Sequence, residues 1–182
     1  MRLRNYITTL FVAFAAVAAA AQTQVVAHRG YWRAPGSAQN SIASLCKADS
    51  INCYGSELDV WLSSDGVLFV NHDAVFKGHN VEQSSSAELS AIILDNGEHM
   101  PTLDEYLAKA KTLKTRIVLE LKAHQTKEKE AEAVAKIVEM VEKYGLTDRS
   151  EYISFSLFAC KEFKRVAPQG TDIYYLNGEL SP

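Results

Sequence analysis

The sequence predicts an α/β fold with a parallel sheet, built as a (β/α)8 barrel. Short apolar strands alternate with amphipathic helices along the chain, which indicates parallel strands joined by helical crossovers. Charged and titratable residues lie at or near the ends of successive strands, and in a barrel these ends converge on one mouth. An open doubly wound sheet would need a glycine-rich phosphate turn after its first strand, and residues 29–32 (Arg-Gly-Tyr-Trp) are not such a turn.

The composition is that of one ordinary globular domain. The chain has 182 residues, of which 47% are hydrophobic and 23% charged. Its net charge of -3 offers no basic surface, so we expect no nucleic acid partner. Of the three cysteines, Cys46 shares a predicted helical face with Ile42 and Leu45, which favours a buried thiol. A Cys46–Cys53 disulfide is the alternative.

Residues 1–21 predict a signal peptide. Arg2 and Arg4 precede an apolar run over 6–20 that ends in small residues. A membrane anchor is the alternative, but the run is short for a span and ends in alanines. We therefore expect an exported protein, periplasmic or secreted, with no stable membrane anchor after cleavage and a mature domain over 22–182.

The first half of that domain predicts three strands and one helix. An apolar run at 25–27 indicates a buried strand, and Asn40 caps a helix that ends near Ser50. Two further strands follow at 56–62 and 67–71, joined by a Ser-Asp-Gly turn.

A long polar connection follows at residues 73–100. It is too long for a routine loop, and the spacing of Ser85 and Glu88 predicts a capping box and a short helix within it. We favour an insertion that forms one wall of the functional site, with a variable surface insertion as the alternative.

The second half continues the alternation. Thr102 and Glu105 form a second capping box, which begins a helix that runs to about 113. The elements expected after it are a strand at 116–121, a helix at 126–144, a strand at 152–156, a helix at 157–166 and a strand at 173–176. The chain thus has six predicted strands, whereas a barrel has eight and typically needs about 250 residues. We therefore expect a barrel that is truncated after about six strands, at its C-terminal end.

Two strands carry acids where apolar residues should stand. Glu57 and Asp59 are two residues apart, so a strand points both to the same face. Like charges on one face repel, and a bound divalent cation would compensate them. Glu120 and Lys122 repeat this spacing, and His72 follows the strand at 67–71. The alternative is a solvated strand end with an ordinary surface histidine.

Six short motifs then occur in the order found in one known family: His28-Arg29-Gly30, Glu57-x-Asp59, His72-Asp73, Pro101-Thr102-Leu103-x-Glu105, Glu120-x-Lys122 and Ser154-Phe155. On these motifs the sequence resembles the glycerophosphodiester phosphodiesterases over about residues 25–176. The connection at 73–100 also looks like the insertion of that family.

The resemblance implies a barrel enzyme that uses a divalent cation, Mg²⁺ or Ca²⁺. Its reaction would be the hydrolysis of small-molecule glycerophosphodiesters to glycerol 3-phosphate and an alcohol, through a cyclic phosphate. Carried over by position, the implied roles are metal ligands for Glu57, Asp59 and Glu120, the acid/base pair for His28 and His72, and phosphate contacts for Arg29 and Lys122.

One departure concerns Gln39-Asn40-Ser41, where the family usually has Glu-Asn-Thr. We expect altered local hydrogen bonding there and no loss of activity, because that carboxylate is not among the implied metal ligands. Two other functions stay open. One is a catalytically silent exported domain that binds metal or phosphate, and the other is a lysophospholipid-cleaving enzyme on the same scaffold.

Overall fold

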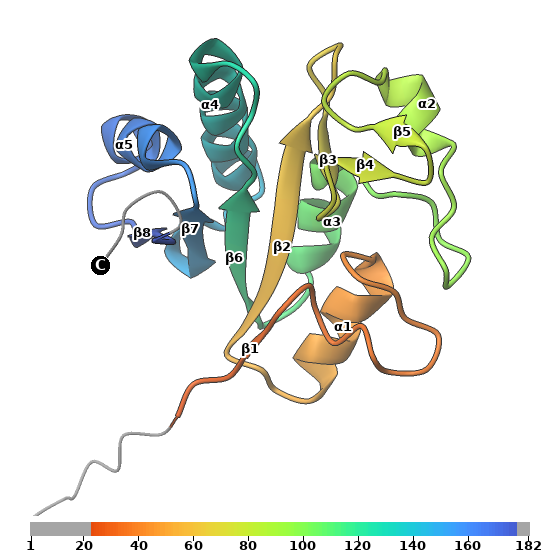
Figure 1. Ribbon diagram of the computed structural model, residues 1–182. Coiled ribbons are helices and arrows are strands. Elements are labelled where there is room, and N and C mark those ends of the chain that lie inside the picture. Colours follow the sequence, from red (N-terminus) through yellow and green to blue (C-terminus); the bar gives the residue numbers. More distant parts are fainter. Residues whose placement is uncertain (1–22, 178–182) are drawn as a thin grey trace, which may run out of the picture.

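The computed structural model describes residues 23–177, so the predicted signal peptide lies outside the described residues. Its centre is a six-stranded sheet with the order β1-β2-β6-β7-β8 and with β3 paired to β2 (Figure 1). The strands of this sheet are β1 (Val26–Ala27), β2 (Gly55–Leu62), β3 (Leu68–Val70), β6 (Arg116–Leu121), β7 (Ser150–Ser154) and β8 (Ile173–Tyr175). These correspond to the six predicted strands, with ends shifted by up to two residues.

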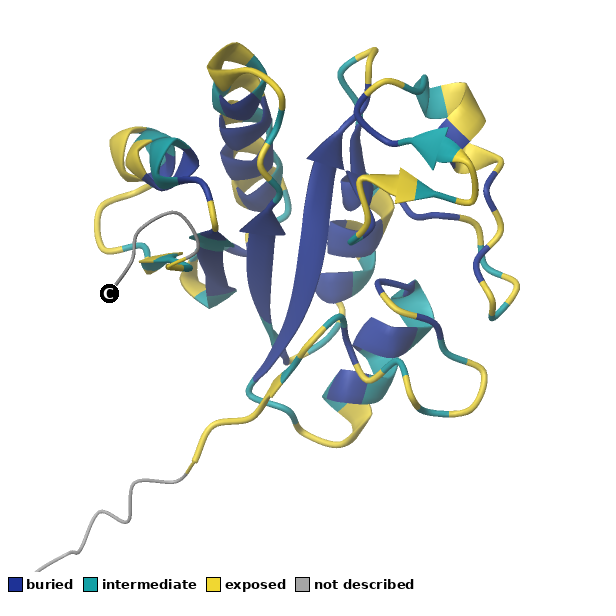
Figure 2. Ribbon diagram, in the orientation of Figure 1, coloured by how far each residue is buried: buried dark blue, intermediate teal, exposed yellow. Residues whose placement is uncertain are grey.

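Four helices pack on one face of the sheet, namely α1 (Ile42–Ser50), α3 (Leu103–Ala110), α4 (Lys127–Lys143) and α5 (Leu157–Val166). A 3-10 turn, η1 (Thr147–Arg149), precedes β7. Leu58, Val60 and Leu62 of β2 belong to the core cluster formed with these helices. Since side chains alternate along a strand, Glu57 and Asp59 lie on the opposite face of β2. Figure 2 shows that β2 is buried along its length and that β6 is buried after its half-buried first residue, Arg116.

Helix α4 confirms the strongest helical prediction. The Thr126 hydroxyl accepts a hydrogen bond from the Lys129 backbone amide and begins the helix, and Val134, Ile137 and Val138 form its buried stripe. Both predicted capping boxes, at Ser85 and Thr102, are also present. The predicted cap of α1 is wrong by one residue. Ser41 accepts from the Ser44 amide and caps the helix, and Asn40 has a different function.

One prediction about the sheet needs correction. β1, β2, β6, β7 and β8 are parallel neighbours, as a barrel requires, but β3 pairs antiparallel with β2. The turn over residues 63–67 is too short for the crossover that parallel strands need, so the chain folds back as a hairpin. The described strands form an open arc with five parallel members.

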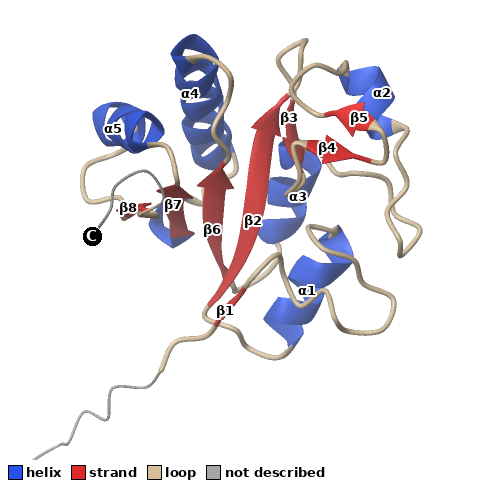
Figure 3. Cartoon of the chain, in the orientation of Figure 1, coloured by secondary structure: helices blue, strands red, loops and turns tan. Residues whose placement is uncertain are grey.

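The connection at 73–100 folds into a small layer of its own, which Figure 3 shows beside the C-terminal end of β2. It contains a hairpin of β4 (Val75–Phe76) and β5 (His79–Asn80), followed by helix α2 (Ser86–Ser90). A second apolar cluster seats this layer on β2 and β3, and it consists of Ala38, Trp61, Phe69, Val81, Leu89, Ile92, Leu94 and Met100. The Glu98 carboxylate also accepts hydrogen bonds from the amides of Ile42 and Ala43, at 2.9 and 3.1 Å. The insertion thereby holds the first turn of α1.

Within residues 23–177, no helix is both long enough and apolar enough to cross a membrane.

Candidate functional site

Three buried carboxylates meet on the face of β2 that points away from the helices. β2 and β6 pair in parallel register, with Asp59 directly beside Glu120. One carboxylate oxygen from each of Glu57, Asp59 and Glu120 lies within 4.8 Å of the other two. All three residues are buried. The predicted convergence of these acids is therefore present, although Glu57 and Asp59 lie inside β2 and not at its end.

The Glu57 side chain is the least compensated member of this cluster. Burial, and secondarily the charge of Asp59, raises the pKa of Glu57 to about 8. Its Oε2 accepts the backbone N–H of Arg29 at 2.7 Å, whereas its buried Oε1 has no hydrogen-bond partner among the described residues. Three carboxylates with one unsatisfied buried oxygen are the donor set that a hard divalent cation prefers.

Two basic side chains already contact the acids. The Lys122 ammonium lies 2.7 Å from Glu120 Oε1 and 3.2 Å from Asp59 Oδ1. Burial alone would lower the pKa of Lys122, but its hydrogen bond to Glu120 and the charge of Asp59 outweigh burial and raise it. Arg29 Nε lies 3.8 Å from Asp59 Oδ2. The family resemblance implies that Lys122 and Arg29 contact the phosphate of the substrate. In the structure both side chains lie beside the carboxylates.

Asn40 belongs to the site and was missed from the sequence. Its Nδ2 donates to Asp59 Oδ2 at 2.9 Å, and its Oδ1 accepts the Asp59 backbone N–H at 3.2 Å. Asn40 is buried and has a left-handed φ of 59°. Asparagine adopts this conformation more readily than most residues. An Asn-Ser pair offers two candidate caps, and only the structure shows that Ser41 takes that role.

The His28-Arg29-Gly30 turn follows β1, and its backbone conformation explains why a glycine stands at position 30. Arg29 and Gly30 have left-handed φ angles of 59° and 73°, and the Gly30 amide donates to the Ala27 carbonyl at 3.0 Å. A Cβ at Gly30 would collide with Ser44, so glycine is required there. This turn aims the Arg29 amide at Glu57 and leaves His28 largely exposed, with Nε2 3.9 Å from Glu57 Oε2. Burial, followed by the charge of Arg29, lowers the pKa of His28.

His72 also lies near the carboxylate cluster, but it follows β3, which runs antiparallel to β2. Because β3 is antiparallel to β2, the chain returns toward Asp59, and the Asn71 amide donates to the Asp59 carbonyl at 3.0 Å. The His72 Nδ1 lies 2.8 Å from Asp73 Oδ1. A carboxylate can only accept, so Nδ1 carries the hydrogen and Nε2 is free to exchange a proton.

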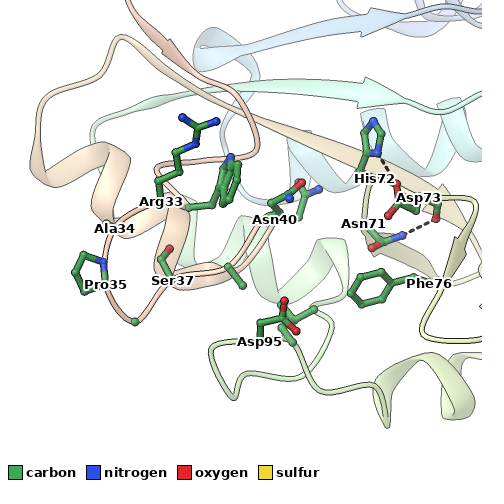
Figure 4. Close-up of a pocket in the computed structure, with 15 residues that line it drawn as sticks. Arg33, Ala34, Pro35, Ser37, Asn40, Asn71, His72, Asp73, Phe76 and Asp95 are labelled. Carbon is green, nitrogen blue, oxygen red and sulfur yellow. Dashed lines mark hydrogen bonds and ion pairs between the residues drawn. The ribbon is translucent and has the colours of Figure 1, made fainter.

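A pocket of about 530 Å³ opens beside His72 (Figure 4). The loop at 32–40 forms one wall, and Asn71, His72 and Asp73 form another. Phe76, Leu94 and Asp95 of the insertion complete the lining. That the insertion forms a wall of the functional site stays a prediction. At the root of the loop, Gln39 Oε1 accepts from Arg29 Nη1 at 2.5 Å, so an amide replaces the usual carboxylate as a neutral acceptor.

The fold and the site together define a class of protein, one whose described strands form part of an α/β barrel that carries a buried carboxylate cluster with two histidines beside it. The chain belongs to the glycerophosphoryl diester phosphodiesterase family, whose model matches residues 28–178. A curated relative, a glycerophosphodiester phosphodiesterase of Caldanaerobacter subterraneus, is 26% identical over 159 residues. That match covers 81% of this chain and 64% of the relative.

Solved structures agree with this assignment. A glycerophosphodiester phosphodiesterase of Parabacteroides distasonis is 49% identical with a TM-score of 0.83, over 87% of this chain and 66% of that one. A phosphodiesterase of Oleispira antarctica, solved in complex with the product sn-glycerol-3-phosphate, is 29% identical with a TM-score of 0.70, over 84% of this chain and 64% of that one. The chain thus spans less than two thirds of the length of these relatives.

Proposed function

We propose that this protein hydrolyses glycerophosphodiesters to glycerol 3-phosphate and an alcohol, with a divalent cation held by Glu57, Asp59 and Glu120. The observation that carries this proposal is the buried carboxylate cluster, in which one oxygen of Glu57 has no partner and the pKa of Glu57 is raised to about 8. Lys122 and Arg29 border Asp59 and Glu120 but leave Glu57 Oε1 without a partner, and such a buried group is costly unless a further positive charge joins it. When bound, Mg²⁺ or Ca²⁺ would supply charge stabilisation for the phosphoryl oxygens.

The basic side chains would hold the phosphate beside this cluster. Lys122 and Arg29 both border Asp59, so a phosphate that approaches the carboxylates meets two positive charges at the same edge. Their ion pairs with Asp59 fix both groups before substrate arrives, which lowers the entropic cost of binding.

His28 and His72 would transfer the protons. They follow β1 and β3, and His28 Nε2 lies within 4 Å of Glu57. The glycerol group of the substrate carries a hydroxyl beside its ester oxygen, and attack by that hydroxyl has an effective molarity that free water lacks. One histidine would take the hydroxyl proton while the other protonates the leaving alcohol, and water would then open the cyclic phosphate with the two roles reversed.

The pocket beside His72 would receive one of the two groups esterified to the phosphate. Its lining combines two aromatic rings, Trp32 and Phe76, with polar groups of Asn40, Asn71 and Asp95. A wall with this many polar groups suits a small hydrophilic alcohol better than an acyl chain, which favours glycerophosphodiesters over lysophospholipids.

We also propose that the protein is exported after removal of residues 1–21, since those residues have the charged and apolar regions of a signal peptide.

The test is release of glycerol 3-phosphate from glycerophosphocholine by the full chain, with Mg²⁺ or Ca²⁺ and then with excess chelator. We expect release only with the cation. Cation binding without any release would favour the silent binding domain, and release from lysophosphatidylcholine alone would favour the lipid-cleaving alternative.

A further inference from the structure

His124 lies just after β6 and links two strands through both nitrogens of its ring. Nε2 lies 2.9 Å from the Leu62 backbone nitrogen, and Nδ1 lies 2.7 Å from the Lys122 carbonyl oxygen. An amide can only donate and a carbonyl can only accept, so Nδ1 carries the hydrogen and Nε2 carries the lone pair. Only the neutral ring in this one tautomer makes both hydrogen bonds.

The ring stands where the ladder between β2 and β6 would otherwise continue. The Lys122 amide donates to the Val60 carbonyl at 3.1 Å, which is a regular parallel contact. In a regular ladder the next bond would join the Leu62 amide directly to the Lys122 carbonyl. Here the imidazole of His124 is inserted between those two groups and bonds to each. The backbone of Lys122 is therefore held at a spacing that the ring sets.

The same ring supports the segment that contains His72. Trp61 packs against His124 with ring centroids 5.2 Å apart and an interplanar angle of 57°. The Trp61 indole N–H donates to the His72 carbonyl at 3.3 Å. His124 thus contacts the main chain of Lys122 directly and that of His72 through one intervening side chain.

We infer that His124 is a positioning residue that holds Lys122 against Asp59 and Glu120 by bridging β2 and β6 with its neutral ring. This inference rests on the proposed function for its effect on catalysis, while the bridge itself does not. Lys122 has its ammonium 2.7 Å from Glu120, and a displacement of its backbone moves that charge. Displacements of about 1 Å can cost on the order of 10²-fold in rate.

Charged groups surround His124 from the insertion and from α4. Glu82 and Glu130 favour its protonated form, and Glu130 Oε1 also accepts the His124 backbone amide at 3.1 Å. Lys129 opposes protonation. Burial is the largest effect, and the pKa of His124 is lowered from its ordinary value. The neutral bridge is consistent with this balance.

The experiment compares two substitutions of His124 in the full chain. His124→Phe keeps a ring against Trp61 but has no ring nitrogen, whereas His124→Gln can still accept from one backbone group and donate to the other. His99→Phe is the matched control, because His99 is exposed and pairs with Glu105, and neither residue belongs to the carboxylate cluster. We expect His124→Phe to lower kcat by about 10- to 100-fold, with His124→Gln recovering most of the loss and the control unchanged.

Two further measurements separate positioning from a merely structural role. In a Lys122→Met background, His124→Phe should have little additional effect on kcat, because the two changes act through one interaction. Ring ¹⁵N–¹H correlations of the full chain should show the hydrogen of His124 on Nδ1, and His124→Phe but not His99→Phe should shift the amide signals of Leu62 and Lys122. A hydrogen on Nε2, or additive losses in the double variant, would overturn the inference. If the full chain releases no glycerol 3-phosphate, the proposed function fails, and the spectroscopic results alone decide on the bridge.

Discussion

Asn40 makes two hydrogen bonds to Asp59. Its Nδ2 donates to the carboxylate Oδ2 at 2.9 Å, and its Oδ1 accepts the Asp59 backbone N–H at 3.2 Å. This contact joins the loop before α1 to the middle of β2. Asp59 also receives Lys122 and Arg29, so its carboxylate is the common partner of three side chains. A residue with that many fixed contacts cannot rotate away from the cluster, which keeps one metal-ligand candidate in place before any cation arrives.

We predict that Asn40→Ala destabilises the protein by about 2–4 kcal/mol, because it removes two hydrogen bonds to a buried charged residue. Asn52→Ala is the control, since Asn52 has nearly the same left-handed φ of 58° but is exposed and precedes β2. The control should cost only about 1 kcal/mol, from the backbone conformation. Urea unfolding of both variants at neutral pH measures the difference. Equal losses would show that the contact with Asp59 contributes little.

The carboxylate cluster predicts a strong dependence on divalent cations. Excess chelator should abolish turnover, and Mg²⁺ or Ca²⁺ should restore it. The cation should also stabilise the folded protein, by about 2.7 kcal/mol at a concentration 100 times its Kd. Thermal unfolding with and without the cation measures this effect.

Glu57→Gln tests the ligand assignment, and Glu139→Gln on the exposed face of α4 is its control. The cation should raise the melting temperature of the control as it does in the unaltered protein, but much less in Glu57→Gln. Undiminished turnover in excess chelator would contradict the role of these acids as ligands.

The sequence was sufficient for the features that depend on local spacing. The two-residue period of a strand places Glu57 and Asp59 on one face, and the capping boxes at Ser85 and Thr102 mark two helix starts. The direction of β3 was mispredicted although the information was present, since a turn as short as the one after β2 permits only a hairpin.

Two site features could not be obtained from the sequence, because they depend on backbone groups that are distant along the chain. His124 bonds to the amide of Leu62, 62 residues away, and no residue pattern encodes a contact between a side chain and a remote amide. The two-point contact between Asn40 and Asp59 likewise requires the loop before α1 to lie over β2. Asparagine next to serine before a helix predicts a cap equally well at either position.

The neutral ring of His124 predicts a loss of stability in acid. The pKa of His124 in the folded protein is below the ordinary value of 6.5. Below pH 6.5, His124 therefore binds a proton more readily in the unfolded chain than in the folded protein. The stability that His124 contributes is therefore present above pH 6.5 and decreases as the pH falls from 6.5 toward the folded-state pKa. Between about pH 8 and about pH 5, the difference in unfolding free energy between the unaltered protein and His124→Gln should fall by at most about 1.4 kcal/mol per pH unit, the limit for one proton. A difference that is independent of pH would contradict the neutral bridge.

The two histidines at the mouth give the sharpest test of the reaction itself. His28 and His72 lie on separate strand ends, next to Glu57 and Asp73 respectively, and neither is part of the apolar core. We predict that His28→Ala and His72→Ala each lower kcat by at least about 10²-fold with the fold intact, the usual loss for a missing acid or base. His79→Ala, in the insertion hairpin, is the matched control and should leave kcat unchanged. A substrate without the hydroxyl beside the phosphoester should resist cleavage by the unaltered protein, because the intramolecular attack is then impossible. If that deoxy substrate is cleaved at the normal rate, water attacks the phosphorus directly and the cyclic phosphate is not an intermediate.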